Sequence, residues 1–147
     1  MTRKLTDLSE HLESMGVRNL IDQLEYPIDV RDERTTQILS DYQNDPSLRL
    51  FGLKEEGMLL GLIGLLLTSP YAATIRHIVV RRELRGCGVG RRLIEAVCLE
   101  FSLVGLEAET DDDAVDFYRK CGFSIQSLGE IYPGVGRYRC RQLMTQS

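Results

Sequence analysis

The sequence predicts one α/β domain (α+β by some schemes) of three layers, in which helices flank a mixed central sheet. Its 147 residues suit a single domain over 1–147, because two cores of half that length would each be marginal. Hydrophobic residues make up 43% and charged residues 27%, which is typical of a globular protein and excludes disorder. The predicted order of helices and strands includes a strand–helix–strand unit. Such a unit requires a right-handed crossover between parallel strands.

The N-terminal third of the chain shows helical spacing. Apolar residues recur every three or four positions over 5–15, with an Asp-x-x-Glu variant of the capping box at Asp7 and Glu10. A second short helix is predicted over 17–24, ended by Pro27, and a third over 35–42, ended before Pro46. Three helices are therefore expected ahead of the sheet.

The remainder alternates between strand and helix patterns. Strands are predicted over 48–52, over the apolar run 58–67 that a tight turn introduces, and over 73–80. Glycines inside the run 58–67 argue against the rival helix there. A strongly amphipathic helix follows over 88–101, then a strand over 103–109 and a helix from Asp111 to Cys121. A hairpin of strands over 123–128 and 138–143 closes the fold.

Charge and cysteine content narrow the class of protein. The net charge of -4 disfavours nucleic acid as the main partner. The cysteines form no CxxC pair and accompany no His-rich spacing, so neither a disulfide framework nor a metal site is expected. The N-terminus is too polar for a signal peptide, and no apolar run reaches the ~20 residues of a membrane helix. A cytoplasmic protein without a membrane partner is the prediction.

A glycine-rich turn between a strand and a helix carries the chemistry. In Arg85-Gly-Cys-Gly-Val-Gly90, the glycines lack Cβ atoms, so a ligand can approach the backbone N–H groups at the helix N-terminus. Successive N–H groups of this kind form a phosphate or pyrophosphate site, and Arg85, Arg91 and Arg92 add positive charge. The Walker and Rossmann spacings are both absent, which excludes the two common nucleotide motifs.

These residues resemble the GNAT superfamily of N-acetyltransferases. The turn fits the Arg/Gln-x-x-Gly-x-Gly/Ala signature, and Ala114-Val-Asp-Phe-Tyr-Arg-Lys-Cys-Gly-Phe123 resembles the second family motif. The resemblance spans about a third of the chain, from about Thr74 to Phe123. It implies a sheet whose parallel strand pair splays apart, with acetyl-CoA in the gap.

The resemblance also implies which residues bind the cosubstrate. Backbone groups of Ile78, Val79 and Val80 would pair with pantetheine, and a backbone N–H of Val79 or Val80 would stabilise the oxyanion. Asp111, where relatives often carry Asn, would contact pantetheine, with capping of the next helix as the alternative. The pyrophosphate would lie on the turn, at Arg85, Gly86, Cys87, Gly88, Val89, Gly90, Arg91 and Arg92.

The catalytic residues are Tyr118 and Glu109 in this interpretation. Tyr118 matches the general acid of the family, and a phenol can protonate the departing thiolate. Glu109 stands near the C-terminal end of its strand, where ligands usually collect, and is the first candidate for the base; Glu107 and His77 are the alternatives. Cys87 lacks the partners of a nucleophile, and Lys120 is a candidate for the ribose phosphate. Four tyrosines are candidates for the acceptor side: Tyr26, Tyr42, Tyr132 and Tyr138.

The resulting hypothesis is an N-acetyltransferase that moves an acetyl group from CoA to a primary amine of a small molecule or protein by direct attack. One alternative is a non-catalytic acyl-CoA-binding module. Another is a tRNA-acetylating toxin, for which Arg137, Arg139 and Arg141 would form the basic patch. A homodimer would pair through an edge strand at 138–143.

Overall fold

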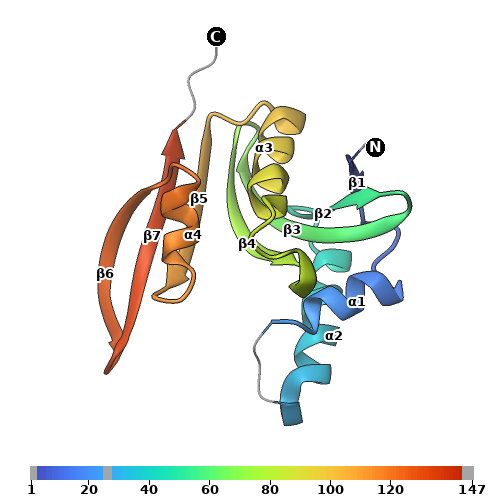
Figure 1. Cartoon of the computed structure of the whole chain (residues 1–147), viewed down its shortest axis with the longest axis horizontal. Coiled ribbons are helices and arrows are strands. Elements are labelled where there is room, and N and C mark those ends of the chain that lie inside the picture. Colours follow the sequence, from blue (N-terminus) through green and yellow to red (C-terminus); the bar gives the residue numbers. More distant parts are fainter. Residues whose placement is uncertain (1–2, 25–27, 144–147) are drawn as a thin grey trace.

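The computed structural model describes residues 3–24 and 28–143, which form one sheet with helices on both faces (Figure 1). Within these residues the sheet has seven strands in the order β1-β2-β3-β4-β5-β7-β6. Every neighbouring pair is antiparallel except β4 and β5. The elements are β1 (Arg3–Asp7), α1 (Met15–Ile21), α2 (Ile28–Asn44), β2 (Leu48–Glu55), β3 (Met58–Ser69), β4 (Ala72–Val80), a 3-10 turn η1 (Arg82–Leu84), α3 (Val89–Phe101), β5 (Gly105–Asp111), α4 (Val115–Lys120), β6 (Ser124–Tyr132) and β7 (Val135–Leu143).

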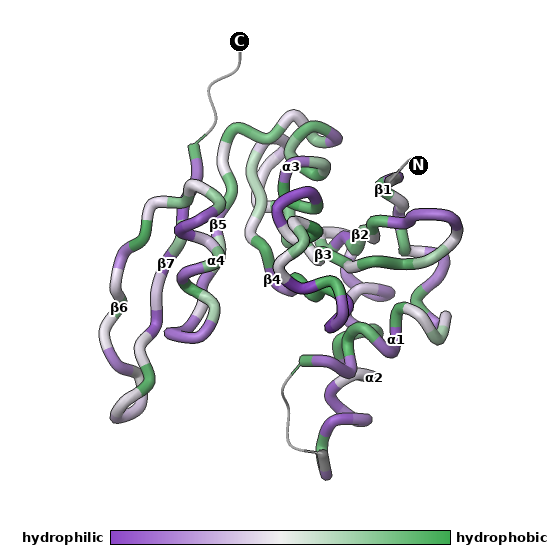
Figure 2. The backbone as a smooth tube through the Cα atoms, viewed as in Figure 1, coloured by the Kyte–Doolittle hydropathy of each residue, from purple (hydrophilic) through white to green (hydrophobic). Residues whose placement is uncertain are grey.

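The apolar run in β3 is buried on both faces, because it lies between two helical layers. Leu60, Ile63 and Leu65 belong to the core under α3 and α4. Leu59 and Leu62 belong to the core under α1 and α2. Figure 2 shows this hydrophobic stretch running along β3 through the middle of the molecule. The predicted three-layer fold is confirmed.

The parallel strands β4 and β5 separate part of the way along their length. Their pairing runs from Ala72 opposite Gly105 to Ile75 opposite Ala108 and goes no further. On the other side of β4, Leu65 pairs with Ile75 and Gly64 with His77, so Arg76 has no partner in β3. Such a bulge bends a strand and increases its twist, which turns β4 away from β5. The splayed pair is therefore present, and Figure 1 shows the two strands diverging.

The N-terminal helix predicted over 5–15 is wrong. Residues Arg3–Asp7 form β1, which pairs antiparallel with β2, and Leu8 and Leu12 pack into the core under α1 and α2. The Asp7 carboxylate accepts a hydrogen bond of 2.9 Å from the Ser9 N–H, which makes a local turn instead of a capping box. Leucines three or four residues apart suit a helix, but the unpaired edge of β2 provides backbone partners that the local pattern does not reveal.

The position of the last strand also differs from the prediction. β7 lies between β5 and β6, so the strand over 138–143 is not at an edge. The hairpin folds its second strand back beside β5, which leaves β6 as the edge at this end of the sheet and β1 as the edge at the other. A dimer formed by pairing of sheet edges would consequently use β6 or β1 instead of β7. Among the described residues, no helix is both long and apolar enough to cross a membrane.

Candidate active site

The turn between β4 and α3 exposes unpaired backbone donors. Gly86 and Gly88 have φ angles of +82° and +84°, and a Cβ at either position would meet nothing within 4 Å. These backbone conformations favour glycine and turn the chain into α3. The turn borders a pocket of about 290 Å³. The other side of this pocket is formed by Phe117 and Lys120 of α4 and by Cys121, which follows the helix.

Backbone hydrogen bonds narrow the set of available N–H groups. The amides of Arg85 and Cys87 already donate to the carbonyls of Arg82 and Leu84, at 3.4 and 3.1 Å. The first amide of α3 with a backbone acceptor is that of Arg92, which donates to Gly88. Within the described residues, the free donors of the turn are therefore the amides of Gly86, Gly88, Val89, Gly90 and Arg91. These groups and the dipole of α3 favour an anion in front of the helix.

Gly90 serves packing between helices instead of ligand access. A Cβ there would lie 2.8 Å from the Phe117 ring, too close for α3 and α4 to keep their present positions. Gly90 is buried at the start of α3, whereas Gly86 and Gly88 are exposed. The expectation that all three glycines admit the ligand thus applies to the first two, and Gly90 positions Phe117.

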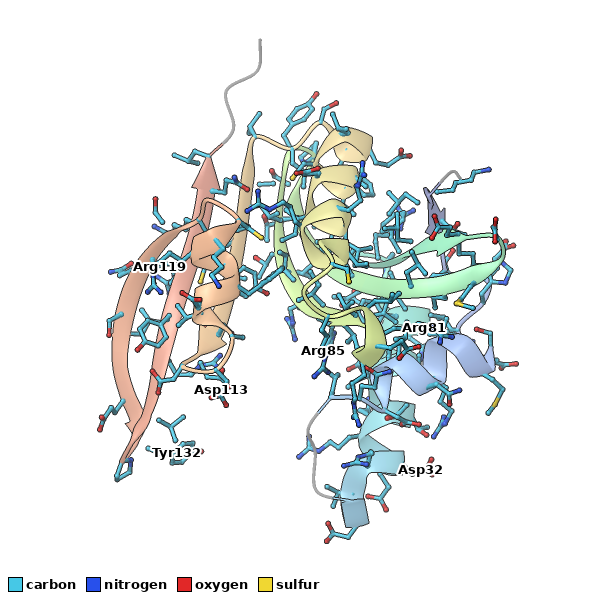
Figure 3. The ribbon with its side chains drawn as sticks, viewed as in Figure 1. Asp32, Arg81, Arg85, Asp113, Arg119 and Tyr132 are labelled. Carbon is cyan, nitrogen blue, oxygen red and sulfur yellow. The ribbon has the colours of Figure 1, made fainter. Side chains whose placement is uncertain are left out.

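The arginines of the turn differ in their partners. Arg85 is exposed on the segment between β4 and α3 (Figure 3). Neither Arg85 nor Arg92 has an ion pair or side-chain hydrogen bond to another described residue. Arg91 donates to the carbonyl of Lys120 at the end of α4. Lys120 itself pairs with Asp116 at 3.2 Å. Arg85 and Arg92 are thus available for a ligand, while Arg91 holds α3 to α4.

Beyond the bulge, the edge of β4 that faces β5 has no strand partner. The Arg81 N–H donates to the Leu60 carbonyl at 2.9 Å. Since the bonding direction alternates along an antiparallel strand, the N–H and C=O groups of Ile78 and Val80 point away from β3 and those of Val79 toward it. Ile78 and Val80 consequently present unpaired backbone groups to the opening between β4 and β5. Of the two amides expected to stabilise an oxyanion, the geometry favours that of Val80.

Tyr118 lies in the core beneath α4. Its side chain is 5% exposed, and its ring makes edge contacts with Phe117 and Phe123. Burial, with smaller contributions from Cys140 and Cys121, raises the pKa of Tyr118 above its ordinary value. The phenol is therefore protonated at neutral pH. Its hydroxyl makes no hydrogen bond to the described residues, which leaves its proton available.

The two candidate glutamates lie on the opposite face of β5 from Tyr118. Leu106 and Ala108 of β5 are buried in the core under α3 and α4, so Glu107 and Glu109 alternate to the other face. There Glu109 pairs with Arg139 at 3.4 Å and with Arg137 at 4.0 Å. Glu107 pairs with Arg141. The expectation that both glutamates share a face near the splayed gap agrees with the structure.

The acidic residues after β5 have structural roles that differ from one another. The Asp111 carboxylate, at the end of β5, accepts hydrogen bonds from the N–H groups of Asp113 and Ala114, at 3.0 and 3.2 Å, and so closes the turn that leads into α4. Asp112 accepts from the Tyr138 hydroxyl at 2.6 Å and from the Gly136 N–H at 2.9 Å. Asp112 therefore attaches the turn before α4 to β7, a contact that local sequence patterns do not predict because it joins distant segments.

His77, which is partly buried, forms a pair with the buried Tyr42, a tyrosine expected on the acceptor side. The Tyr42 hydroxyl lies 2.6 Å from His77 Nδ1 and reaches it over Gly64, where a Cβ would be 1.7 Å from that oxygen. Burial, followed by the charge of Arg76, lowers the pKa of His77 to about 4, so the ring is neutral. Since the Tyr42 O–H has no other acceptor among the described residues, we assign it as donor to Nδ1, which places the ring proton on Nε2. In this tautomer His77 is a hydrogen-bond donor at Nε2 and not a base.

The other tyrosines named for the acceptor side are dispersed. Tyr132 is 69% exposed at the tip of the β6–β7 hairpin (Figure 3), and Tyr138 is bound to Asp112. Tyr26 lies outside the described residues. Cys87 is exposed in the turn.

Comparison with known proteins identifies the family. Residues 16–123 match the family model described as acetyltransferase (GNAT) family. Because this match covers most of the chain, the protein belongs to that family. The splayed strands, the glycine turn and the buried tyrosine are thus features of a GNAT domain.

Two curated relatives share part of the sequence. The chain is 36% identical over 96 residues to a streptothricin acetyltransferase of Escherichia coli, covering 61% of this chain and 55% of the relative. It is 40% identical over 50 residues to the peptidyl-lysine N-acetyltransferase YjaB of Escherichia coli (strain K12), covering 33% and 34%. The matches thus cover about half, or less, of the length of these relatives.

Solved structures share the fold. An acetyltransferase of the GNAT family from Desulfovibrio desulfuricans superposes with a TM-score of 0.78 at 15% identity, covering 97% of this chain and 99% of the other. A Bacillus anthracis protein assigned as a streptothricin acetyltransferase, in complex with acetyl coenzyme A, gives a TM-score of 0.60 at 26% identity, covering 72% and 68%. These similarities confirm the predicted fold, and the family match above confirms the predicted family.

Proposed function

We propose that the protein is an acetyl-CoA-dependent N-acetyltransferase that transfers an acetyl group to a primary amine by direct attack. The observation that carries this proposal is the continuity of unpaired backbone groups. They run from Ile78 and Val80 on the open edge of β4 to the free amides of Gly86 and 88–91 at the start of α3. The relatives add support, because a streptothricin and a peptidyl-lysine acetyltransferase are among them and one structure holds acetyl coenzyme A.

The residues present fit the cosubstrate. The free amides of the turn and the positive end of α3 would bind the pyrophosphate, with Arg85 and Arg92 adding charge. Ile78 and Val80 would pair with the amides of pantetheine as an added strand does. Acetyl-CoA supplies the reactive thioester when bound. The Asp111 carboxylate is already bonded to amides of the turn before α4, so we assign it to positioning α4 and Tyr118 instead of to pantetheine.

Three groups of the chain would serve the transfer. The Val80 N–H would stabilise negative charge that develops on the carbonyl oxygen. Tyr118, protonated because burial raises its pKa, would give its proton to the departing thiolate. The free amine, whose ordinary pKa near ~10.4 makes it cationic in water, would first lose one proton to solvent. Glu109 would accept the second proton, which the nitrogen loses as it bonds to the acetyl carbon. The free cysteines of the structure agree with action in a reducing cytoplasm, which we also propose.

The test combines binding and turnover. Calorimetric titration should show acetyl-CoA binding to the protein, and thiol release should accelerate when a suitable amine from a mixed panel is added. Binding without amine-dependent thiol release would support a non-catalytic acyl-CoA-binding module. Absence of acetyl-CoA binding would overturn the proposal. The tRNA-acetylating alternative is less favoured, because Arg137, Arg139 and Arg141 are paired with glutamates instead of forming an unpaired basic patch.

A further inference from the structure

A second hollow lies where β4 and β5 separate, on the sheet face away from α3 and α4. Its volume is about 540 Å³, and charged side chains dominate its lining. Glu107 and Glu109 project into it from β5, on the opposite face from the buried Leu106 and Ala108. The lining consists of Thr74, Ile75, Arg76, Glu107, Ala108, Glu109, Arg137, Arg139 and Arg141.

Positive charge exceeds negative charge in this lining, which contains four arginines and two glutamates. Arg139 and Arg137 share Glu109, and Arg141 pairs with Glu107. A third acidic residue, Asp111, stands opposite Arg137 in the strand register, but its carboxylate is bonded to the backbone at the start of α4.

Of the four arginines in this lining, Arg76 is the one without a side-chain partner among the described residues. It stands at the bulge of β4 with an exposed side chain and makes no ion pair or side-chain hydrogen bond to any described residue. Its charge acts on Asp45, whose pKa is lowered mainly by hydrogen bonds with Ser47, but the two side chains do not form an ion pair. A guanidinium group in this position is available to a ligand.

The ion pairs of this hollow are also accessible. The Glu109 side chain is 50% exposed, and those of Arg137 and Arg139 are 32% and 36% exposed. Exposed pairs contribute little to the stability of a fold, so a ligand group of the same charge can replace a partner at small cost. The hollow thus offers both signs of charge beside the edge of β4 that would hold the acetyl donor.

We propose that the amine acceptor carries at least one carboxylate, as an α- or ω-amino acid does. Arg76 and Arg139 bind the carboxylate through paired N–H donors, and Glu109 faces the amino group. The ammonium group first releases a proton to solvent. The amine nitrogen then bonds to the acetyl carbon, the carbon–sulfur bond breaks, the nitrogen gives a proton to Glu109, and Tyr118 gives one to the sulfur. This inference rests on the proposed function.

Paired acceptors test the proposal. Thiol release is measured with a panel of α- and ω-amino acids, each beside its decarboxylated analogue, for example 4-aminobutanoate beside propylamine, and with spermidine. We expect kcat/KM for the best amino acid to exceed that of its analogue by at least about tenfold. Arg76→Gln should lower this ratio about tenfold. Arg139→Gln should also lower it about tenfold and provides a second test should the first variant fail to fold. Arg119→Gln is the matched control, because Arg119 lies on α4 and pairs with Asp116.

The outcomes separate this inference from the proposed function. If decarboxylated analogues or spermidine are acetylated as efficiently as amino acids, the carboxylate proposal is wrong and the N-acetyltransferase proposal stands. A ratio that Arg76→Gln and Arg139→Gln both leave at the parental value also overturns it. If acetyl-CoA does not bind, or no amine in any class releases thiol, the proposed function fails and this inference fails with it.

Discussion

The two sides of the opening between β4 and β5 are built from different chemical groups. On the β4 side, the available groups belong to the backbone: the open strand edge and the amides of the turn before α3. On the β5 side, they are charged side chains, most of which project from β5 and β7, with Arg76 at the bulge of β4 as the exception. The two sides also differ in what holds them in place. The partly buried pair of Tyr42 and His77 supports β4, whereas accessible ion pairs link β5 to β7.

This difference indicates a division of labour. Backbone groups recognise a ligand through the shape of the chain, so the residues that permit that shape, glycines above all, are restricted. Side chains on an accessible sheet face can change without disturbing the backbone that carries them. A constant acetyl donor suits the first kind of surface, and an acceptor that differs among related enzymes suits the second.

The largest expected effect concerns the support of β4. The pKa of His77 is about 4 in the folded protein and near 6.5 in an unfolded chain, so between these values only the unfolded chain binds the proton. The contribution of neutral His77 to the free energy of unfolding should therefore be fully present above about pH 6.5. It should fall as the pH drops toward 4, by up to about 3 kcal/mol. Denaturant unfolding at several pH values should show that His77→Gln removes this component. His11→Gln, at an exposed histidine, is the control and should keep the parental pH dependence.

The next effect tests the backbone site. Gly88→Val places a side chain at a positive φ and in front of the free amides, so the Kd for acetyl-CoA should rise at least about 100-fold, or about 2.7 kcal/mol. Gly57→Val is the matched control, because Gly57 has φ +80° and equally open surroundings in the β2–β3 turn. Calorimetry of both variants provides the measurement. Equal affinities would show that the turn does not bind the pyrophosphate.

Removal of the Tyr118 hydroxyl should affect turnover alone. Tyr118→Phe keeps the ring contacts with Phe117 and Phe123, and we expect kcat to fall roughly 10- to 100-fold while the Kd for acetyl-CoA stays within about threefold. Because burial raises the pKa of Tyr118, the parental rate should not decline below about pH 10 through loss of this proton. Tyr71→Phe, at an exposed tyrosine of the β3–β4 turn, is the control. A parental kcat in Tyr118→Phe would mean that the residue serves packing only.

The smallest effect is expected for stability on the β5 side. Arg139→Gln removes an accessible ion pair with Glu109, which should change the free energy of unfolding by less than about 1 kcal/mol. A double-mutant cycle with Glu109→Gln measures the coupling directly. A coupling of several kcal/mol would show that these charges hold the sheet together and are not free to exchange with a ligand.

The difference between a backbone site and a side-chain site also explains which parts of the molecule the sequence could predict. The glycine turn, α3, and α4 with Tyr118 follow from local patterns, since their glycines and apolar spacing serve the backbone shape itself. The acceptor face does not follow, because Arg137, Arg139 and Arg141 resemble any charged surface strand until pairing places them opposite Glu107 and Glu109. The prediction for β1 fails for a related reason: Leu5 and the leucines that follow the strand have helical spacing, and only pairing with the distant β2 makes residues Arg3–Asp7 a strand. The Tyr42–His77 pair likewise depends on a contact over Gly64 that no local spacing indicates.

Amide-resolved hydrogen exchange with and without acetyl-CoA tests most directly whether the backbone of β4 and of the turn before α3 binds acetyl-CoA. The account predicts slower exchange at Gly86, Gly88 and the amides of 89–91, and at Ile78 and Val80. It predicts little change at Arg85 and Cys87, whose amides are already bonded within the turn. Protection confined to β5 and β7, with unchanged exchange at the turn and the open edge of β4, would contradict the account.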